Sequence, residues 1–380
     1  MSIKTGNGNG QARICLVTWR NFSRSACRCG HYEAEDVLTE VDDVDLLRLD
    51  ATPSLALKRR WLGGLLWRGV SKRLASINPG LRPVQLSRPY DLLVVMCQDV
   101  WDLPLINAVK GWEKYCRASV CWLDEVWGWL VPQLKSVLHV LNRFDYVALG
   151  LGGSLDSVRR VIDRPCHHVP GAVDAIRFSP YPEPPPRVID ACSIGRKWEG
   201  VHRSLLDLSA KKGFFYFHDT AVDGGIIQVL DHRQHRNVLA NTFKRSRSFV
   251  VAPAKMDLPK ETHGQSEIGY RFFEGSAAGT VMIGRAPVSE DFPKLFGWPD
   301  SVIDIKTDGS DVGEVLSRLI AQPERLRQIS RRNAREALLR HDWMYRWKQI
   351  LGIAGLKPTA AMEAREQRLK QLAELAANDS

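Results

Sequence analysis

The sequence predicts an α/β protein made of two doubly wound domains. Short apolar strands alternate with helical segments in both halves of the chain, which is typical of parallel sheets covered by helices on both faces. A proline-rich stretch interrupts this alternation at residues 169–187. The 380 residues suit two domains, at roughly 100–200 residues per domain. We expect two such domains to leave a cleft between them.

The N-terminal domain is expected at residues 13–168, after a polar and flexible segment at 1–12. Its clearest strand is the apolar run YDLLVVMC at 90–97, of the kind buried on both faces of a parallel sheet. Further strands are expected at 13–19, 45–50, 118–124 and 145–151, and helices at 31–41, 104–115 and 131–144.

Five of the seven residues from Pro180 to Pro186 are prolines, which predicts a stiff, extended backbone, so residues 169–187 are interpreted as an interdomain linker. The alternation then restarts and predicts a second domain at 188–338. Its helices are expected at 202–213, 232–246, 266–278 and 311–321. Its strands are expected at 188–196, 214–219, 247–254 and 301–306, with a further strand directly after the helix at 266–278, in the stretch that ends at Gly284. A crossover helix at 339–356 and a charged helical tail at 357–380 complete the chain.

Charge and composition narrow the class of protein. The net charge of +10 and the pI near 9.3 favour anionic partners, such as nucleotide phosphates, acidic lipids or nucleic acid. The first residues lack the apolar core of a signal peptide, and no stretch reaches the ~18 apolar residues of a membrane-spanning helix. The scattered cysteines suit reduced thiols in a cytoplasmic protein. We expect no zinc site at Cys27, Cys29 and His31, because no second pair of ligands follows.

One stretch, GQSEIGYRFFEGSAAGTVMIG at 264–284, combines acids with very small residues. A helix over 266–278 places Glu267, Arg271 and Glu274 on one face. The backbone N–H groups at its start suit an anion such as a diphosphate, and Glu274 suits the vicinal hydroxyls of a ribose. Arg271 and Glu274 are therefore candidates for binding such a ligand. The alternative is a helix whose arginine and acids pair with one another at the surface.

Within this stretch, RFFEGSAAGTVMIG resembles the donor-binding helix of GT-B glycosyltransferases, especially family 4 and its spore-maturation-type relatives. In that pattern Glu274 takes the place of the second acid. The first acid, which contacts the sugar, falls on Ser266, so that the neighbouring Glu267 is the candidate for this role. The other matches to the donor-binding pattern are Gly269, Gly279 and Thr280.

Three further segments resemble the same family: VPGAVDAIRFSP (169–180), SIGRKWEGVHRSLLDL (193–208) and RHDWMYRWKQIL (340–351). The second of these is similar to the element whose arginine and lysine bind the donor diphosphate. Arg196 matches the arginine. The lysine position falls on Val201, which leaves Lys197, His202 or Arg203 to supply the second cation.

The resemblance implies a GT-B enzyme with two Rossmann-like domains and C-terminal helices that cross back. It implies transfer of a sugar from a nucleotide-diphosphate sugar to a glycan, a lipid-linked acceptor or a cell-surface polysaccharide precursor. Retention of configuration is expected, with no cofactor and no metal, because the cations stabilise the leaving diphosphate. Asp43-Val44-Asp45 has the form of a metal-binding D-x-D motif, but it leads into a strand.

Strand ends in the first domain supply candidates for the acceptor side, because ligands bind beyond the carboxyl ends of parallel strands. Gln98 and Asp99 follow one strand, where the family often has a histidine. Asp124 and Glu125 follow another strand and are expected either to orient or deprotonate an acceptor hydroxyl, or to cap the next helix. Nearby tryptophans offer a sugar-stacking surface or form aromatic core: Trp101, Trp122, Trp127 and Trp129.

Residues 57–74 mix basic side chains with tryptophan and leucine, which suits an anionic membrane surface. This interpretation predicts a cytoplasmic protein held peripherally on the inner face of the cell membrane. The alternative is a surface helix with a buried apolar stripe. His232 and His235 have the spacing of a helical metal pair, but no partner ligand is evident, and we expect no metal there.

Two other functions stay open on the sequence alone. A GT-B nucleotide-sugar epimerase would turn over the donor without an acceptor. A non-catalytic basic module would bind nucleic acid or an acidic polymer through its charge, although no nucleic-acid motif stands out.

Overall fold

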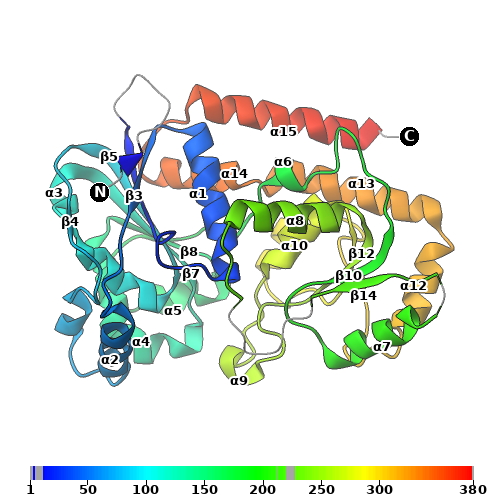
Figure 1. Cartoon of the computed structure of the whole chain (residues 1–380), viewed down its shortest axis with the longest axis horizontal. Coiled ribbons are helices and arrows are strands. Elements are labelled where there is room, and N and C mark those ends of the chain that lie inside the picture. Colours follow the sequence, from blue (N-terminus) through cyan, green and yellow to red (C-terminus); the bar gives the residue numbers. More distant parts are fainter. Residues whose placement is uncertain (1–2, 5–11, 212, 220–226, 379–380) are drawn as a thin grey trace. The chain divides into compact units, whose positions relative to one another are not determined.

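The computed structural model describes residues 3–4, 12–211, 213–219 and 227–378. The chain divides into two compact units (Figure 1). The N-unit consists of Met1–Pro170 and Arg346–Glu363, and the C-unit of Gly171–Tyr345 and Ala364–Ser380. The segment predicted as flexible, 1–12, lies mostly outside the described residues. Residues 171–187 belong to the C-unit rather than to a free linker, because Phe178 is fully buried and Arg187 bonds to C-unit carbonyl groups.

The N-unit is built on a seven-stranded sheet. The strand order is β1 (Ile3–Lys4), β3 (Val44–Arg48), β2 (Ile14–Thr18), β5 (Tyr90–Asp99), β7 (Cys116–Glu125), β8 (Tyr146–Leu149) and β9 (Cys166–His168). Neighbouring strands are parallel except for β1 with β3. The strand order changes direction between β2 and β5, which makes this the switch point where doubly wound sheets bind ligands. The predicted strands of this half are confirmed.

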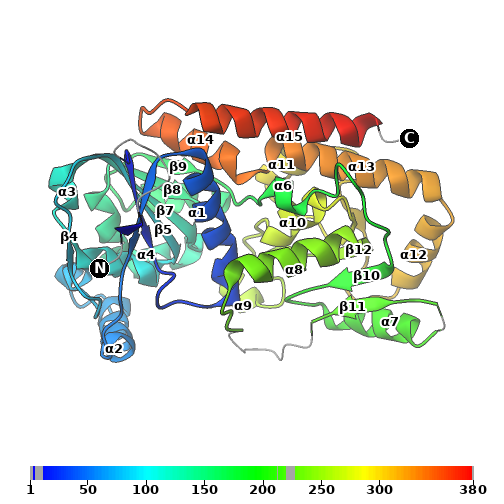
Figure 2. The same cartoon turned by 45° about the horizontal axis from the view of Figure 1, so that its top comes forward.

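Helices cover this sheet, with α2 and α4 side by side in both views (Figures 1 and 2). They are α1 (Cys29–Val41), α2 (Leu55–Trp67), α3 (Trp112–Tyr115), α4 (Val131–Leu138) and α5 (Leu155–Arg159), with 3-10 helices at η1 (Ala26–Arg28), η2 (Lys72–Ser76), η4 (Gly128–Leu130), η5 (His139–Arg143) and η6 (Gly152–Ser154).

The helix predicted at 104–115 is wrong. This segment ends the 3-10 helix η3 (Val100–Ala108) and then forms the short strand β6 (Val109–Lys110), which pairs with β4 (Val84–Gln85), and the single-turn α3. Pro104 cannot donate an α-helical hydrogen bond, and Gly111 has φ +78. Both residues interrupt a continuous helix.

The C-unit contains a five-stranded parallel sheet in the order β11 (Tyr216–His218), β10 (Ile189–Ser193), β12 (Ser246–Val251), β13 (Val281–Gly284) and β14 (Ile303–Asp304). Its switch point lies between β10 and β12. Its helices begin with α6 (Ala175–Phe178), α7 (Glu199–Ser209), α8 (His232–Lys244), α9 (Pro259–Thr262), α10 (Tyr270–Ala277), α11 (Asp291–Phe296), α12 (Val312–Ile320) and α13 (Pro323–Arg340). The last two helices are α14 (Trp343–Ile353), within the crossover helix predicted at 339–356, and α15 (Ala360–Asn378), within the predicted helical tail.

Helix α10 begins later than predicted. Gly269 is its N-cap, and residues 265–269 form an extended loop. The carbonyl oxygen of Glu267 accepts a hydrogen bond from Ala254 N at 2.9 Å, which holds this loop beside the end of β12. The prediction of a helix over 266–278 is therefore wrong in its first turn, and Glu267 does not share a helical face with Glu274.

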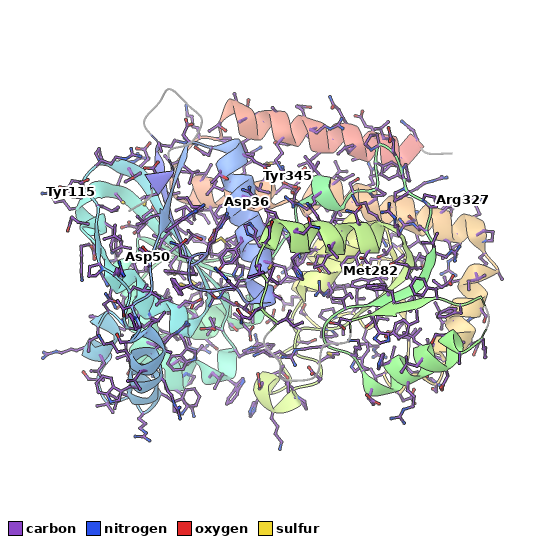
Figure 3. All side chains as sticks on the ribbon, in the orientation of Figure 1. Asp36, Asp50, Tyr115, Met282, Arg327 and Tyr345 are labelled. Carbon is purple, nitrogen blue, oxygen red and sulfur yellow. The ribbon has the colours of Figure 1, made fainter. Side chains whose placement is uncertain are left out.

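The small residues of α10 serve packing. A Cβ added at Gly275 would lie 2.9 Å from Phe249 Cδ1 and 3.2 Å from Met282 Sδ. Met282, labelled in Figure 3, belongs to β13, so that Gly275 allows α10 to lie directly on the sheet. Close approach of a helix to a sheet, rather than of a ligand, therefore explains why this residue is small.

Candidate functional site

Predicted donor residues of the C-unit gather at the switch point of its sheet. The loop at 194–198 follows β10, and the loop at 252–258 follows β12, which is the neighbouring strand across the switch point. Ligands of doubly wound sheets bind in this position. Lys197 lies on the first loop, and Arg271 contacts that loop from α10.

Gly195 lies beside two cationic side chains. Lys197 Nζ donates to the Gly195 carbonyl oxygen at 3.0 Å, and Arg271 Nε donates to the Ile194 carbonyl oxygen at 3.2 Å. A Cβ added at Gly195 would lie 3.7 Å from Arg271 Nη2. Asp219 pairs with Lys197 and accepts from Gly195 N at 2.9 Å. Gly195 is exposed and has φ +89, so that the turn lies at the surface beside both cations, with its N–H held by Asp219 and its carbonyl oxygen by Lys197.

Glu274 is buried between two arginines. Arg236 Nη1 donates to its Oε1, and Arg271 Nη1 donates to its Oε2. The side chains of Glu274 and Arg236 are 2% and 4% exposed, whereas that of Arg271 is 31% exposed. Burial raises the pKa of Glu274, but the two guanidinium groups outweigh burial and hold this pKa below its usual range. Glu274 is therefore a fixed anion, and Arg271 is the member of the set that a ligand can reach.

The loop before α10 holds the other acid of the motif. Glu267 is 4% exposed, and its Oε1 accepts from Gln265 Nε2 at 2.6 Å. Ser266 Oγ accepts from Val288 N at 3.1 Å. The backbone bond between Glu267 and Ala254 places this loop at the end of β12, on the same edge of the sheet as the Gly195 loop.

Arg196 and Arg203 differ in their surroundings. Arg196 Nη1 donates to both carboxylate oxygens of Asp257, at 2.9 and 2.8 Å, and thereby links the two switch-point loops. Arg203 pairs with Glu199 on the surface of α7, and its side chain is 71% exposed. Val201, at the family's lysine position, is buried in the apolar core. The second cation at Gly195 therefore comes from Arg271 on another helix, beside Lys197.

Gly279 and Thr280 lie at the opposite end of α10 from Gly269. Gly279 has φ +62 and follows the last helical turn. Thr280 is fully buried, and its Oγ1 donates to the Gly275 carbonyl oxygen at 2.9 Å. These contacts give both residues a structural role in ending the helix.

An aromatic and histidine cluster adjoins Lys197. His202 Nδ1 lies 2.8 Å from Tyr216 Oη, and the His202 and His218 ring centroids are 4.9 Å apart. Burial lowers the pKa of His202, and the nearby His218 and Lys197 lower it further. The neutral form of His202 is therefore favoured, and its ring lies with those of Tyr216 and His218 in one cluster beside Lys197.

The N-unit brings a histidine to one of the predicted acceptor-side acids. His31 Nε2, near the start of α1, lies 3.0 Å from Asp124 Oδ2 at the end of β7. Glu125 Oε1 accepts from Trp127 Nε1 at 2.8 Å. Asp99 caps η3 by accepting from Trp101 N at 2.8 Å.

Other side chains singled out in the sequence are mostly structural. Trp122 and Trp127 are buried in the core, whereas Trp129 is 38% exposed. Asp45 of the D-x-D motif is 1% exposed and accepts from Tyr90 Oη at 2.8 Å. Over the described parts of the chain, no group of three or more His, Cys, Asp or Glu side chains is arranged to hold a metal ion. None of the helices in those parts is long and apolar enough to cross a membrane.

Sequence reasoning missed two residues of these sites. Arg236 stands in the basic run HRQHR at 232–236, where only the spacing of His232 and His235 was considered and no metal was expected. His31 stood in the C-x-C-x-H pattern at 27–31 and was weighed there as a metal ligand. In both cases the partner acid is distant in the sequence, by 38 and 93 residues, so that no local spacing signals the pair.

Comparison with known proteins relates part of this chain to a protein family. Residues 217–352 match the Glycosyl transferase-like family, and this segment contains Arg236, Arg271 and Glu274. No curated protein matches the sequence.

Several solved structures resemble nearly the whole chain at low identity. HepE from Anabaena, in complex with UDP and glucose, is 11% identical with a TM-score of 0.52, covering 91% of this chain and all (100%) of HepE. The UDP-forming α,α-trehalose-phosphate synthase from Burkholderia xenovorans, in complex with glucose-6-phosphate, is 11% identical with a TM-score of 0.54, covering 90% and 100%. An α-glucosyltransferase in complex with UDP and a DNA containing an HMU base is 10% identical with a TM-score of 0.52, covering 91% and 100%.

The chain therefore has the GT-B fold, as the sequence predicted. Its residues 217–352 form a glycosyl transferase-like segment within that fold.

Proposed function

We propose that this GT-B protein is a glycosyltransferase that moves a sugar from a nucleoside-diphosphate sugar to an acceptor hydroxyl. The observation that carries this proposal is the meeting of Lys197 and Arg271 at the exposed backbone of Gly195. Two cations beside an open turn, at the switch point of a parallel sheet, suit a diphosphate. UDP is the first nucleotide to test, because the HepE and α-glucosyltransferase structures contain it.

Each charged residue has a role in this proposal. Lys197 and Arg271 stabilise the diphosphate as it leaves, so that the reaction needs no metal ion or cofactor. Glu274 accepts hydrogen bonds from the ribose hydroxyls, and Glu267 with the backbone of 266–269 contacts the sugar. Arg196, paired with Asp257, lies on the loop at 194–198 together with Lys197. We propose retention of the anomeric configuration, following the resemblance to family 4.

On the acceptor side we propose Asp124, held by His31, as the group that orients the acceptor hydroxyl. Its side chain is 15% exposed, so that it is enclosed by protein but still reaches solvent. Glu125 is the second candidate, although one of its carboxylate oxygens already accepts from Trp127. The proposed acceptor class is a glycan, a lipid-linked sugar or a cell-surface polysaccharide precursor.

Thermal unfolding with a panel of UDP, GDP, ADP and their sugar derivatives tests the donor function. The matched control for Glu274→Ala is Glu314→Ala, because Glu314 is 72% exposed on α12. We expect one nucleotide family to raise the unfolding temperature of the wild type and of the control, but not of Glu274→Ala. The absence of any shift in the wild type would contradict the proposal. Binding that survives Glu274→Ala and falls steeply with salt would favour the basic-module alternative.

Turnover of the donor alone separates the transferase from an epimerase. Incubation of the nucleotide sugar without acceptor, followed by separation of the products, would reveal an epimerised nucleotide sugar only for the epimerase. For the transferase we expect most of the donor to stay intact. The only reaction expected is slow transfer of its sugar to water, which releases the nucleoside diphosphate.

We also propose a cytoplasmic protein that binds an anionic membrane surface through residues 57–74. Large apolar side chains are exposed there, at 73% for Leu57 and 59% for Trp61, next to the exposed Lys58 and Arg60. Apolar insertion and attraction to acidic headgroups reinforce each other. Arg59 is not part of this surface, because it pairs with the buried Asp102.

Co-sedimentation with phosphatidylcholine vesicles, with and without phosphatidylglycerol, tests the membrane proposal. We expect Lys58→Glu with Arg60→Glu to abolish binding to the anionic vesicles, and Arg327→Glu on α13 to leave it intact. Equal binding of the wild type and the Lys58→Glu, Arg60→Glu variant would contradict it.

A further inference from the structure

Arg236 is fixed on both sides of its guanidinium group. It lies on α8, which packs beside α10 in both views (Figures 1 and 2). One side of the group meets Glu274 Oε1, and its central carbon lies 4.7 Å from the centroid of the buried Phe178 ring. A buried guanidinium is stable in such a place only when it is paired, and here the pair is with Glu274.

The two arginines on Glu274 differ in exposure. Arg236 is enclosed, whereas the partly exposed Arg271 reaches across to the Ile194 carbonyl and Gly195. A carboxylate oxygen can accept more than one hydrogen bond. If Arg271 turns from Oε2 toward a diphosphate at Gly195, Oε2 becomes available to a hydroxyl while Arg236 still balances the charge of Glu274.

We propose that Arg236 is a positioning residue of the donor site, which holds Glu274 in place while Arg271 is exchanged between Glu274 and the donor diphosphate. The inference rests on the proposed donor function. It assigns the ribose contact to Glu274 Oε2 and the diphosphate contact to Arg271. Arg236 itself touches neither and acts through Glu274.

The charges around Glu274 give this role a pH signature. The charged and titratable groups that act on Glu274 are Arg236 and His235 from α8 and Arg271 from its own helix. With both arginines present, the pKa of Glu274 stays below its usual range. Without Arg236, one guanidinium group instead of two offsets burial, so that the pKa of Glu274 rises relative to the wild type and Glu274 accepts the ribose hydroxyls less well at lower pH.

Titration calorimetry with UDP and with 2′-deoxy-UDP tests the inference. The variants are Arg236→Gln, Arg236→Lys, Glu274→Gln and the double variant, with Arg327→Gln as the control for an exposed arginine on α13. We expect Arg236→Gln to weaken UDP binding by about tenfold or more, which is about 1.4 kcal/mol, and to remove the preference for UDP over its 2′-deoxy form. Arg236→Lys restores part of both effects. The double variant binds no more weakly than Glu274→Gln, because the two residues act as one unit.

Unchanged UDP affinity and ribose preference in Arg236→Gln would overturn the inference. The inference would also be overturned if the losses of UDP affinity in Arg236→Gln and Glu274→Gln multiplied in the double variant. A wild type that binds none of UDP, GDP and ADP would instead contradict the proposed function itself, and a wild type that prefers GDP or ADP is titrated with that nucleotide and its 2′-deoxy form.

Unfolding of the ligand-free protein separates these two failures. Arg236→Gln should lose stability relative to the wild type as the pH rises through the range in which Glu274 loses its proton, because the loss of a guanidinium group raises the folded pKa of Glu274 above its wild-type value. Arg327→Gln should keep a constant difference from the wild type. A stability difference for Arg236→Gln that does not change with pH would overturn the role of Arg236 even if UDP binds.

Discussion

His31 and Asp124 form an enclosed pair, with His31 Nε2 3.0 Å from Asp124 Oδ2. A Cβ added at Gly150, at the end of β8, would lie 2.6 Å from Asp124 Oδ1, so that backbone closes around this carboxylate. The Asp124 side chain nevertheless keeps 15% exposure, whereas His31 keeps 4%. The pair therefore presents one carboxylate edge at the carboxyl ends of the parallel strands, and the imidazole fixes its orientation.

This pairing predicts a selective effect of His31→Gln. We expect the transfer of sugar from a UDP-sugar to water, which releases UDP, to slow by about tenfold or more, because Asp124 loses its orientation toward the accepting hydroxyl. The affinity for UDP should stay unchanged. The measurement pairs turnover with UDP titration. His139→Gln, at an exposed position on η5, is the control. Full turnover in His31→Gln, or loss of UDP affinity, would contradict the assignment.

Arg187 is predicted to be a major source of stability in the C-unit. Its guanidinium donates to the carbonyl oxygens of Ser246 at 2.5 Å, Ala278 at 3.0 Å and Gly279 at 2.8 Å. These carbonyl groups follow α8 and α10 and have no helical partner of their own. We expect Arg187→Met to lower the free energy of unfolding by about 3 kcal/mol, because each unsatisfied buried acceptor costs about 1–3 kcal/mol.

Urea unfolding of Arg187→Met beside Arg327→Met measures this effect. Arg327 is exposed and pairs only at the surface with Glu324, so its loss should change stability little. Similar unfolding midpoints for the two variants would show that the carbonyl cluster is satisfied without Arg187.

Gly279→Ala separates a structural glycine from a ligand contact. Gly279 has φ +62, and an added Cβ would lie 2.9 Å from the Ser330 carbonyl oxygen. We expect a loss of about 1–2 kcal/mol in stability, because the left-handed conformation is unfavourable for alanine. UDP affinity should not change at temperatures where the variant is folded. A variant of native stability that binds UDP poorly would restore Gly279 to the donor site.

The alternation of strands and helices predicted both sheets because each strand is a local apolar run that needs cover on both faces. The predicted helix boundaries were wrong where a single residue determines where the helix begins or ends. Residues 266–269 have helical spacing, but Gly269 starts the helix, and the bond between Glu267 and Ala254 draws the loop to β12. The helix predicted at 104–115 does not form, because Pro104 and Gly111 interrupt it.

The candidate site was predictable only in part. Lys197, Arg271 and Glu274 were found through local motifs, and the structure brings them to one edge of the sheet. Arg236 and His31 were not, since their partners come from other elements and no periodicity links them. The pairing of two helices across a sheet is a property of the tertiary fold, which a single sequence does not display.

The pH dependence of stability should report His202 and His235. Burial lowers the pKa of both, with His218 and Lys197 acting further on His202, and Arg236 and Arg271 on His235. A histidine with a lowered folded pKa contributes stability above its unfolded pKa of about 6.5 and loses it as the pH falls through the lowered value. We expect His202→Gln with His235→Gln to flatten the fall in unfolding temperature on acidification below about pH 6.5. An equally steep fall in the double variant would contradict this assignment.

The difference between UDP and UMP affinity tests the central claim most directly, because the β-phosphate is the group assigned to the Gly195 loop. Calorimetric titration of the wild type should show UDP binding more tightly than UMP by about tenfold or more, which is about 1.4 kcal/mol. Lys197→Met with Arg271→Met should remove this difference, whereas Arg327→Met should preserve it. A wild type that binds UDP and UMP equally, or a double variant that keeps the preference, would contradict a diphosphate site at Lys197 and Arg271.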